Sequence, residues 1–227
     1  WIPEKENTSL YIRPFMFATD EYIGIKPSDN YLFMIFTCPV GAYYSKPVNV
    51  KLETKYTRAV EGGTGSAKAA GNYAASLYPA KLAQAEGYQQ LIWTDGKDHE
   101  YIEESGTMNL MFIASDTLYT APVGDTILNG VTRDSVLTLA RDWGMKVEER
   151  RIKVQELQDA LKEDRVQEAF GTGTAATIAH ISSKRIKKNR YELPSLDKRK
   201  FSNKVLETLE GIKRGTQADK FNWNHVL

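Results

Sequence analysis

Lys68 lies in a run of small residues that extends from Gly62 to Gly71. Glycine and alanine let other groups approach the backbone closely, and they leave room around one long amine. An amine in such a setting can be desolvated and held neutral, which a Schiff-base nucleophile requires. Taken alone, however, the run is more typical of a glycine-rich loop that carries a solvated surface lysine.

Two acidic residues and a tyrosine could act together with that amine. Tyr73 follows Lys68 closely and could hydrogen-bond a phenolic oxygen of a bound ring. Glu103 and Glu104 come just before a tight turn at Gly106. A carboxylate there could hold a pyridine nitrogen protonated, which makes the ring an electron sink. By itself, an acidic turn of this kind is more typically solvated.

Two loops of glycine and hydroxyl residues could bind a phosphate. Gly130 precedes a predicted helix, so the backbone N–H groups of Val131 and Thr132 are free to bind an anion. The alternative is an ordinary threonine cap, which stabilises a helix by about 1 kcal/mol. The loop 171–174 offers hydroxyls for the far side of the same phosphate. With the amine and the acidic pair, these loops describe a pyridoxal phosphate site better than any other chemistry.

Other motifs fit less well. The stretch 171–176 satisfies the loose dinucleotide pattern Gly-x-Gly-x-x-Ala, but a strand-like sequence follows where that motif requires a helix. Gly96-Lys97 is followed by Asp98, so it does not form a Walker phosphate loop. The spacing of the three histidines does not suit a structural metal, and we expect none; they are His99, His180 and His225.

Composition indicates a soluble globular chain with enough residues for one large domain or two small ones. Its 227 residues are 41% hydrophobic and 26% charged, and the net charge of +1 gives no general attraction to nucleic acid or acidic membranes. No apolar run approaches the ~20 residues of a membrane span. Cys38 is the single cysteine, which excludes an internal disulfide and fits the reducing cytoplasm. The basic run 184–190 is predicted to be a solvated hairpin, with nucleic-acid binding a distant alternative.

The spacing of apolar residues predicts an α+β fold. Strands are expected over 9–18, 31–38, 89–94, 109–114, 117–120, 146–154 and 174–181, and helices between Gly71 and Gly87 and over 132–143, 156–164 and 203–214. In the first helix, one apolar face is predicted, and Pro79 is predicted to kink or break the helix; the face consists of Tyr73, Leu77, Ala80 and Leu82, with Ala83. Segment 46–57 is charged and contains Pro47, so we expect an extended linker there.

The order and spacing of these motifs closely resemble the branched-chain amino acid aminotransferases, which are pyridoxal phosphate enzymes of fold-type IV. The resemblance runs nearly end to end and is specific in segments 9–14, 38–43, 62–75, 104–109, 128–135 and 170–175. Two positions depart from the family pattern: Ala70 stands where a second glycine is usual, and Asn129 stands where proline is common. Neither departure removes a catalytic group.

The resemblance implies a role for each candidate site residue. Lys68 matches the Schiff-base lysine, which also carries a proton between the substrate α-carbon and the cofactor C4′. Tyr73 matches the tyrosine at the cofactor O3′, and Glu104, rather than Glu103, matches the acid at the pyridine nitrogen. Contacts to the phosphate match Val131, Thr132 and Thr174, and Leu128 matches a residue that packs against the ring. Thr107 and Ala175 match positions that bind the substrate carboxylate. Tyr11 and Arg13 match the segment that reaches the substrate side chain, where Arg13 would receive the distal carboxylate of glutamate.

The resemblance also implies an activity and a domain organisation. The expected reaction is reversible amino transfer between leucine, isoleucine or valine and 2-oxoglutarate, which yields glutamate, in a cytoplasmic homodimer. Residues 1–47 would be the end of a smaller N-terminal α/β domain, and 48–227 would be the large cofactor-binding domain. Since the chain begins at Trp1, much of the small domain would be absent. A D-amino acid transaminase, an aminodeoxychorismate lyase and a truncated, catalytically silent core are the alternatives.

Overall fold

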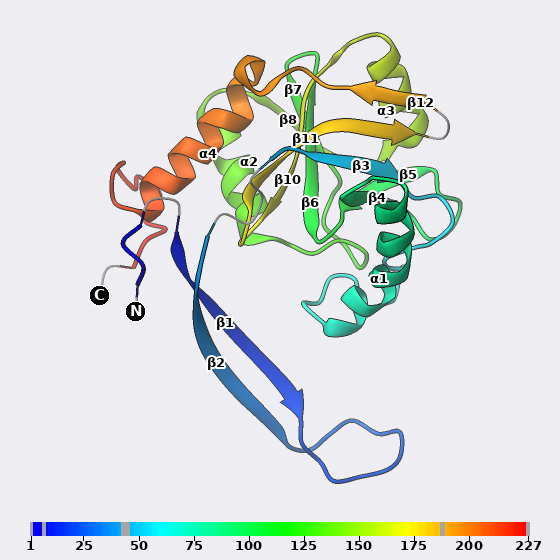
Figure 1. Cartoon of the computed structure of the whole chain (residues 1–227), viewed down its shortest axis with the longest axis vertical. Helices are drawn as coiled ribbons and strands as arrows, with labels where there is room; N and C mark the ends of the chain where they lie inside the picture. The colour runs from blue at the N-terminus through cyan, green and yellow to red at the C-terminus, as the bar shows by residue number, and fades with distance from the viewer. Residues whose placement is uncertain (1, 6–7, 42–45, 187–188, 226–227) are drawn as a thin grey trace. The chain divides into compact units, whose positions relative to one another are not determined.

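The computed structural model describes residues 2–5, 8–41, 46–186 and 189–225, with the backbone alone for Lys184, Arg185 and Arg190. The chain divides into two compact units, Trp1–Ser45 and Lys46–Leu227. The first is a hairpin, and the second contains the helices and the large sheet (Figure 1).

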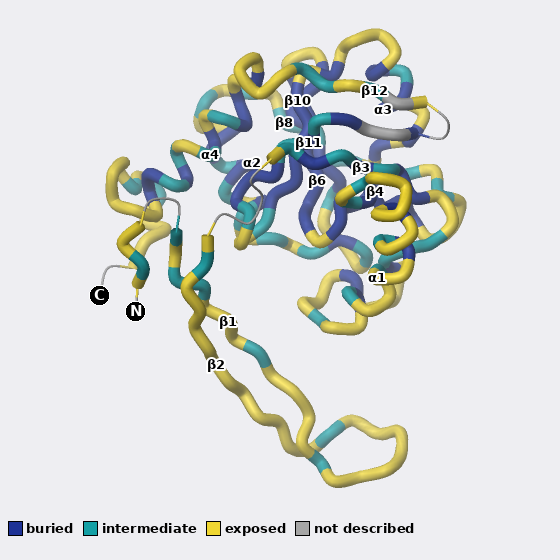
Figure 2. The backbone as a smooth tube through the Cα atoms, in the orientation of Figure 1, coloured by how far each residue is buried: buried dark blue, intermediate teal, exposed yellow. Residues whose placement is uncertain are grey.

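The hairpin unit consists of β1 (Ser9–Ala18) and β2 (Tyr31–Val40), paired antiparallel along their whole length. This confirms the predicted strand pair. Most residues of both strands are exposed (Figure 2), and Phe15 packs edge-on against Phe36 with ring centroids 5.7 Å apart.

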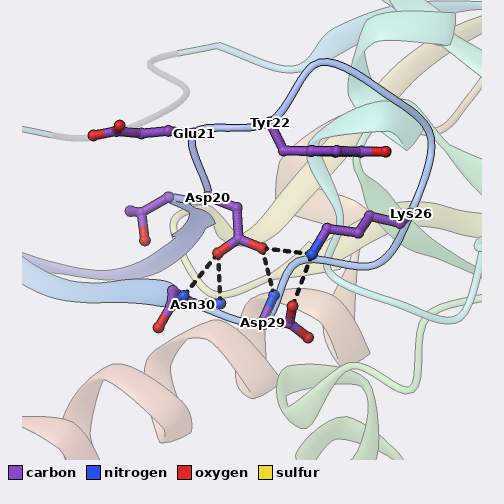
Figure 3. A pocket seen from close by; sticks show the side chains of 7 residues that line it. Asp20, Glu21, Tyr22, Lys26, Asp29 and Asn30 are labelled. Carbon is purple, nitrogen blue, oxygen red and sulfur yellow. Dashed lines mark hydrogen bonds and ion pairs between the residues drawn. The ribbon is translucent and has the colours of Figure 1, made fainter.

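Asp20 organises the loop between the two strands (Figure 3). Its carboxylate accepts hydrogen bonds from the backbone N–H groups of Asp29, at 2.8 Å, and Asn30, at 3.0 Å, and from the Lys26 ammonium, at 3.3 Å. The amide of Asp29 and the Asn30 side chain lead the effects that lower the pKa of Asp20 to about 2. The hollow of about 640 Å³ beside this loop contains none of the predicted site residues. The Asp20 carboxylate, which lines the hollow, already closes the loop through its hydrogen bonds.

The larger unit is built on a sheet of ten strands among the described residues. They are β3 (Val48–Leu52), β4 (Gln90–Thr94), β5 (Tyr101–Ser105), β6 (Met108–Ala114), β7 (Thr117–Thr120), β8 (Lys146–Glu149), β9 (Ile152–Lys153), β10 (Val166–Gly173), β11 (Thr177–Ile186) and β12 (Asn189–Glu192). Six of these pair in a closed ring, β3–β4–β5–β6–β10–β11 and back to β3, which forms a small barrel. The barrel mixes antiparallel pairs with the parallel pairs on both sides of β3.

Four α-helices accompany this sheet in the described residues: α1 (Ala70–Ala85), α2 (Val131–Asp142), α3 (Val154–Lys162) and α4 (Lys200–Lys213). The main hydrophobic core lies where α2 and α4 pack against β6, β10 and β11 (Figure 1). Phe201 of α4 belongs to this core, with its ring centroid 5.8 Å from that of Trp143 and 6.2 Å from that of Phe170. The predicted inner face of α2 is confirmed, since Val136, Leu137, Leu139 and Ala140 are all buried.

The predicted linker over 46–57 is wrong. Residues Val48–Leu52 form β3, which lies between β4 and β11. Val48, Val50 and Leu52 are buried, so this short alternating pattern marks a barrel strand. Within the strand, the charged residue Lys51 pairs with Glu86 of the α1 C-cap at 2.6 Å.

The predicted break at Pro79 is wrong, and the predicted apolar face of α1 is only partly right, since Ala83 is buried but Leu77 and Leu82 are not. The helix is one segment from Ala70 to Ala85, and its buried residues are Asn72, Pro79 and Ala83. Leu77 is 68% exposed and Leu82 is 40% exposed. Proline therefore packs against the sheet side, while the larger apolar residues remain on the surface. Gly87 ends the helix with a φ of +87°, as predicted.

Two further strand predictions change in detail. The segment 146–154 is divided into β8, which pairs with β7, and β9, which pairs with β5. The strand predicted over 174–181 begins at Thr177, because 174–176 form the turn after β10. In the basic run 184–190, Lys187 and Lys188 lie outside the described residues, and their neighbours belong to the β11–β12 hairpin.

Candidate active site

Glu104 lies on β5 and is 2% exposed, so the alternative of a solvated acidic turn is excluded. Its Oε2 pairs with Arg58 Nε at 2.9 Å. Its Oε1 accepts hydrogen bonds from Asn109 Nδ2 at 2.8 Å and from the Leu128 backbone N–H at 3.1 Å. Three donors therefore fix both oxygens of one buried carboxyl group.

Burial raises the pKa of Glu104 to about 7. Three groups oppose this rise: the Arg58 guanidinium, the Leu128 N–H and the positive charge of Lys68. The Glu103 carboxylate adds to it. Since Lys68 acts on this carboxyl group through space, the structure brings the predicted amine and the predicted acid into one neighbourhood. The carboxylate form prevails above pH 7.

Arg58 is a site residue that the sequence analysis missed. Besides Glu104, its guanidinium donates to the Thr126 carbonyl at 2.7 Å and to the Gly65 carbonyl at 3.2 Å. It therefore connects the buried acid to the glycine-rich loop and to the loop before α2. No motif marks this arginine, because Glu104 and Thr126 are distant in sequence and meet it only in the folded barrel.

Asn109 connects Glu104 to the start of α2. Its Nδ2 also donates to the Leu128 carbonyl at 2.8 Å. A Cβ atom on Gly130, the N-cap of α2, would lie 2.3 Å from Asn109 Oδ1, so any larger residue there would displace the Asn109 side chain. Gly130 provides no side-chain cap, and Val131 is 81% exposed. The first N–H groups of α2 are therefore available to an anion.

Lys68 precedes α1 on an exposed turn that Asn72 holds in place. The buried Asn72 side chain donates to the carbonyls of Thr64, at 2.7 Å, and Ala67, at 2.9 Å, and accepts from the Thr64 hydroxyl at 2.8 Å. Lys68 Nζ lies 5.4 Å from the centroid of the Tyr73 ring. The desolvation predicted for this amine is not a property of the turn itself, because Lys68 is exposed.

Two exposed turns carry the remaining candidates of the larger unit. Thr107 lies in the β5–β6 turn, and Thr174 and Ala175 lie in the β10–β11 turn. Because Thr172 pairs with Asn109 across β10 and β6, both turns are at the same edge of the barrel. The Thr172 hydroxyl is buried there with no hydrogen-bond partner among the described residues.

These groups fit pyridoxal phosphate. A buried carboxyl group with a pKa near neutrality suits a pyridine nitrogen, and an uncapped helix start suits a phosphate. Glycine at position 130 and the orphan Thr172 hydroxyl belong to the same edge of the barrel. Leu128 contributes its backbone to the Glu104 network, a contact that the sequence analysis did not foresee.

Tyr11 and Arg13 belong to the hairpin unit, on the same face of β1. The Arg13 guanidinium lies 5.0 Å from the centroid of the Tyr11 ring. The two predicted substrate-side-chain residues are therefore neighbours on one strand.

The family model for class IV aminotransferases matches residues 2–183, and the chain belongs to this family. It is 42% identical over 226 residues to branched-chain-amino-acid aminotransferase 2 of Bacillus subtilis, with 98% of this chain and 62% of that protein covered. It is 41% identical over 227 residues to branched-chain-amino-acid transaminase 1 of the same organism, with 98% and 64% covered. The chain thus spans less than two thirds of the length of these relatives.

Solved structures give the same result for the fold. The branched-chain aminotransferase from Thermoproteus uzoniensis with norvaline matches with a TM-score of 0.80 at 27% identity, covering 94% of this chain and 68% of that one. The Escherichia coli branched-chain amino acid aminotransferase matches with a TM-score of 0.77 at 28% identity, covering 95% and 69%. An aminotransferase from Brucella abortus bound to pyridoxal phosphate matches in fold, with a TM-score of 0.73 at 22% identity and coverage of 90% and 70%. The predicted family and α+β fold are confirmed.

Among the described residues, no helix is long and apolar enough to cross a membrane. No group of three or more histidine, cysteine, aspartate or glutamate side chains within the described ranges is arranged to hold a metal ion.

Proposed function

We propose that this chain carries the cofactor-binding part of a pyridoxal phosphate-dependent branched-chain amino acid aminotransferase. It would transfer the amino group between leucine, isoleucine or valine and 2-oxoglutarate, with glutamate as product. The Arg58–Glu104–Asn109 network supports this most directly, because it joins a buried acid to the start of α2. We also propose residues 1–47 as the end of the small domain and 48–227 as the large domain.

The cofactor supplies, when bound, an electron sink for the bonds of the substrate α-carbon. Glu104 would hydrogen-bond its pyridine nitrogen, and the Tyr73 hydroxyl would bind O3′. The N–H groups of Val131 and Thr132 and the Thr174 hydroxyl would bind the phosphate. The Leu128 side chain would pack against the ring.

Lys68 is the proposed catalytic residue. Its amine would hold the cofactor covalently and, once released, carry a proton between the substrate α-carbon and the cofactor C4′. Thr107 and Ala175 would bind the substrate carboxylate from the two adjoining turns. Tyr11 and Arg13 would contact the substrate side chain, with Arg13 receiving the distal carboxylate of glutamate.

Visible absorption of the chain with added pyridoxal phosphate, before and after leucine, tests this proposal. We expect a band that depends on Lys68 and shifts with leucine. Lys68→Ala should lose the band and retain less than about a thousandth of the turnover, given the usual size of acid–base effects and the lost covalent bond. Lys81→Ala, an exposed lysine on α1, is the matched control. Near-normal turnover in Lys68→Ala would contradict the proposal.

Substrate class and assembly need separate measurements. A screen of amino donors should favour leucine, isoleucine and valine over D-amino acids; the reverse order would indicate another fold-type IV enzyme.

We propose a cytoplasmic homodimer. The exposed apolar residues Leu77 and Tyr78 of α1 support the homodimer. The single cysteine supports the cytoplasmic location. Sedimentation equilibrium and cell fractionation test these two points.

A further inference from the structure

The buried hydroxyl of Thr172 has no hydrogen-bond partner among the described residues. Thr172 lies near the end of β10 and is 1% exposed. Thr120, a second buried threonine of the same sheet, differs, because its hydroxyl donates to the Leu110 carbonyl at 2.8 Å. Burying a hydroxyl without a partner costs free energy, so a group that binds from outside the chain is the expected partner of Thr172.

The register of the sheet places Thr172 in one row with two residues of the proposed site. Thr172 pairs with Asn109 across β10 and β6, and Asn109 pairs with Glu104 across β6 and β5. Residues directly opposite each other in antiparallel strands point to the same face, so these three side chains share one face of the sheet. Neighbouring strands lie about 4.8 Å apart, which puts the ends of the row about 10 Å apart. Glu104 is at one end of the row and Thr172 at the other.

The start of α2 lies against the middle of this row. Asn109 donates to the Leu128 carbonyl, and a Cβ atom on Gly130 would lie 2.3 Å from Asn109 Oδ1. The free N–H groups at the start of α2 attract an anion, and an unpaired hydroxyl on the neighbouring strand offers it one more donor. A turn about χ1 moves a threonine hydroxyl between staggered positions without moving the strand, so the Thr172 hydroxyl can turn toward a ligand.

We propose, on the basis of the proposed function, that Thr172 is a further phosphate-binding residue of the same site. Its hydroxyl donates to a phosphate oxygen beside the N–H groups of Val131 and Thr132. The alternative is a threonine that serves only through the packing of its methyl group. Both roles allow an apolar replacement in the ligand-free fold, but only the binding role predicts that this replacement weakens phosphate binding.

Thr172→Val tests the role, because it removes the hydroxyl and keeps the shape of the side chain. In the ligand-free chain we expect an unchanged or higher midpoint of urea unfolding, since a methyl group replaces an unpaired buried hydroxyl. Binding of inorganic phosphate, followed by phosphorus NMR, should weaken at least about tenfold, the usual effect of losing one hydrogen bond to a charged group. Thr172→Ser keeps the hydroxyl and should retain most of the affinity.

Thr120→Val is the matched control, because it removes a buried hydroxyl that has a partner. It should lower the midpoint of urea unfolding and leave the affinity for phosphate unchanged. Phosphate affinity that Thr172→Val leaves unchanged would overturn the assignment, and so would the absence of phosphate binding to the unchanged chain.

Pyridoxal, which lacks the phosphate, shows which end of the cofactor the hydroxyl contacts. Thr172→Val should weaken the binding of pyridoxal phosphate at least about tenfold and leave that of pyridoxal unchanged. An equal loss for both compounds would overturn the assignment.

The Lys68-dependent absorption band separates this test from that of the proposed function. Phosphate binding that depends on Thr172 in a chain without the band would support Thr172 as a phosphate-binding residue and contradict the proposed function. The band together with phosphate binding that does not depend on Thr172 would support the proposed function and overturn the role of Thr172.

Discussion

The Glu104 carboxylate and the Asn109 amide face each other across the β5–β6 hairpin, with Oε1 and Nδ2 2.8 Å apart. The same amide nitrogen donates to the Leu128 carbonyl, and Gly130 lies against the side-chain oxygen of Asn109. One side chain therefore sets the distance between the buried acid and the start of α2. In the proposed site these two places hold opposite ends of the cofactor.

Asn109→Ala should weaken cofactor binding without preventing folding. The substitution removes one donor to a buried carboxylate and the support of the Leu128 carbonyl, at a cost of about 1–3 kcal/mol. This corresponds to roughly five- to 150-fold in the dissociation constant. Fluorescence titration with pyridoxal phosphate measures it, with Asn203→Ala, whose amide bonds only near α4, as control. An unchanged dissociation constant would separate Asn109 from the cofactor site.

Cofactor affinity should depend on pH through Glu104. With a folded-state pKa of about 7, the carboxylate becomes available to a pyridinium N–H as pH rises from 6 to 8, so binding should tighten over that range. Glu104→Gln should bind more weakly above pH 7 and lose this dependence. Titrations from pH 5.5 to 8.5 test it. A slope that persists in Glu104→Gln would mean that another group is responsible.

The raised pKa of Glu104 also predicts the direction in which the stability of the fold changes with pH. Because the pKa of Glu104 is higher in the folded chain than the ordinary value of 4.5, the folded chain binds more protons between those values. Its contribution to the free energy of unfolding therefore falls as pH rises from about 4.5 to 7, and the loss is complete above 7. Urea unfolding at pH 5 and 8 should show a smaller decline for Glu104→Gln than for the unchanged chain.

Sequence patterns were sufficient where local chemistry decides the structure. The inner face of α2 follows from its spacing. The choice of Glu104 over Glu103 came from the family resemblance and stays a prediction. Arg58 could not be found, because its partners at Gly65, Glu104 and Thr126 meet only when the barrel closes.

Segments with mixed signals were misread for a physical reason. Residues 46–57 combine charge, a proline and a short alternating run, and composition favours a linker there. Pairing with β4 and β11 instead places Val50 in the barrel. In α1, the contact with the sheet is made by Pro79 and Ala83, because small and compact side chains allow a close approach. Propensity alone does not predict which face of a helix will be covered.

Asn72→Ala should disturb Lys68 more than it disturbs the fold. It removes three hydrogen bonds that hold the turn 64–67 just before Lys68, at about 1 kcal/mol for each. We expect a several-fold slower appearance of the Lys68-dependent absorption band and lower turnover. Asn72→Asp keeps the acceptor for the Thr64 hydroxyl and loses the two donated bonds, so its effect should be intermediate or larger through repulsion of the carbonyls. A normal rate in both variants would show that the turn needs no such clamp.

Glu168→Ala should destabilise the fold far from the proposed site. Glu168 is 5% exposed and accepts the backbone N–H groups of Phe201 and Ser202, both at 2.8 Å, at the start of α4. It also lies near the buried Arg199 guanidinium, whose charge would lose its counterion. Breaking such a buried arrangement costs about 3–5 kcal/mol.

Urea unfolding measures this loss, and two variants bracket it. Glu168→Gln keeps one acceptor oxygen and should cost less than Glu168→Ala. Glu163→Ala breaks only the exposed pair with Arg165 and should cost about 0–1 kcal/mol. If Glu168→Ala proved as stable as Glu163→Ala, the start of α4 would be held by the packing of Phe201 rather than by the buried carboxylate.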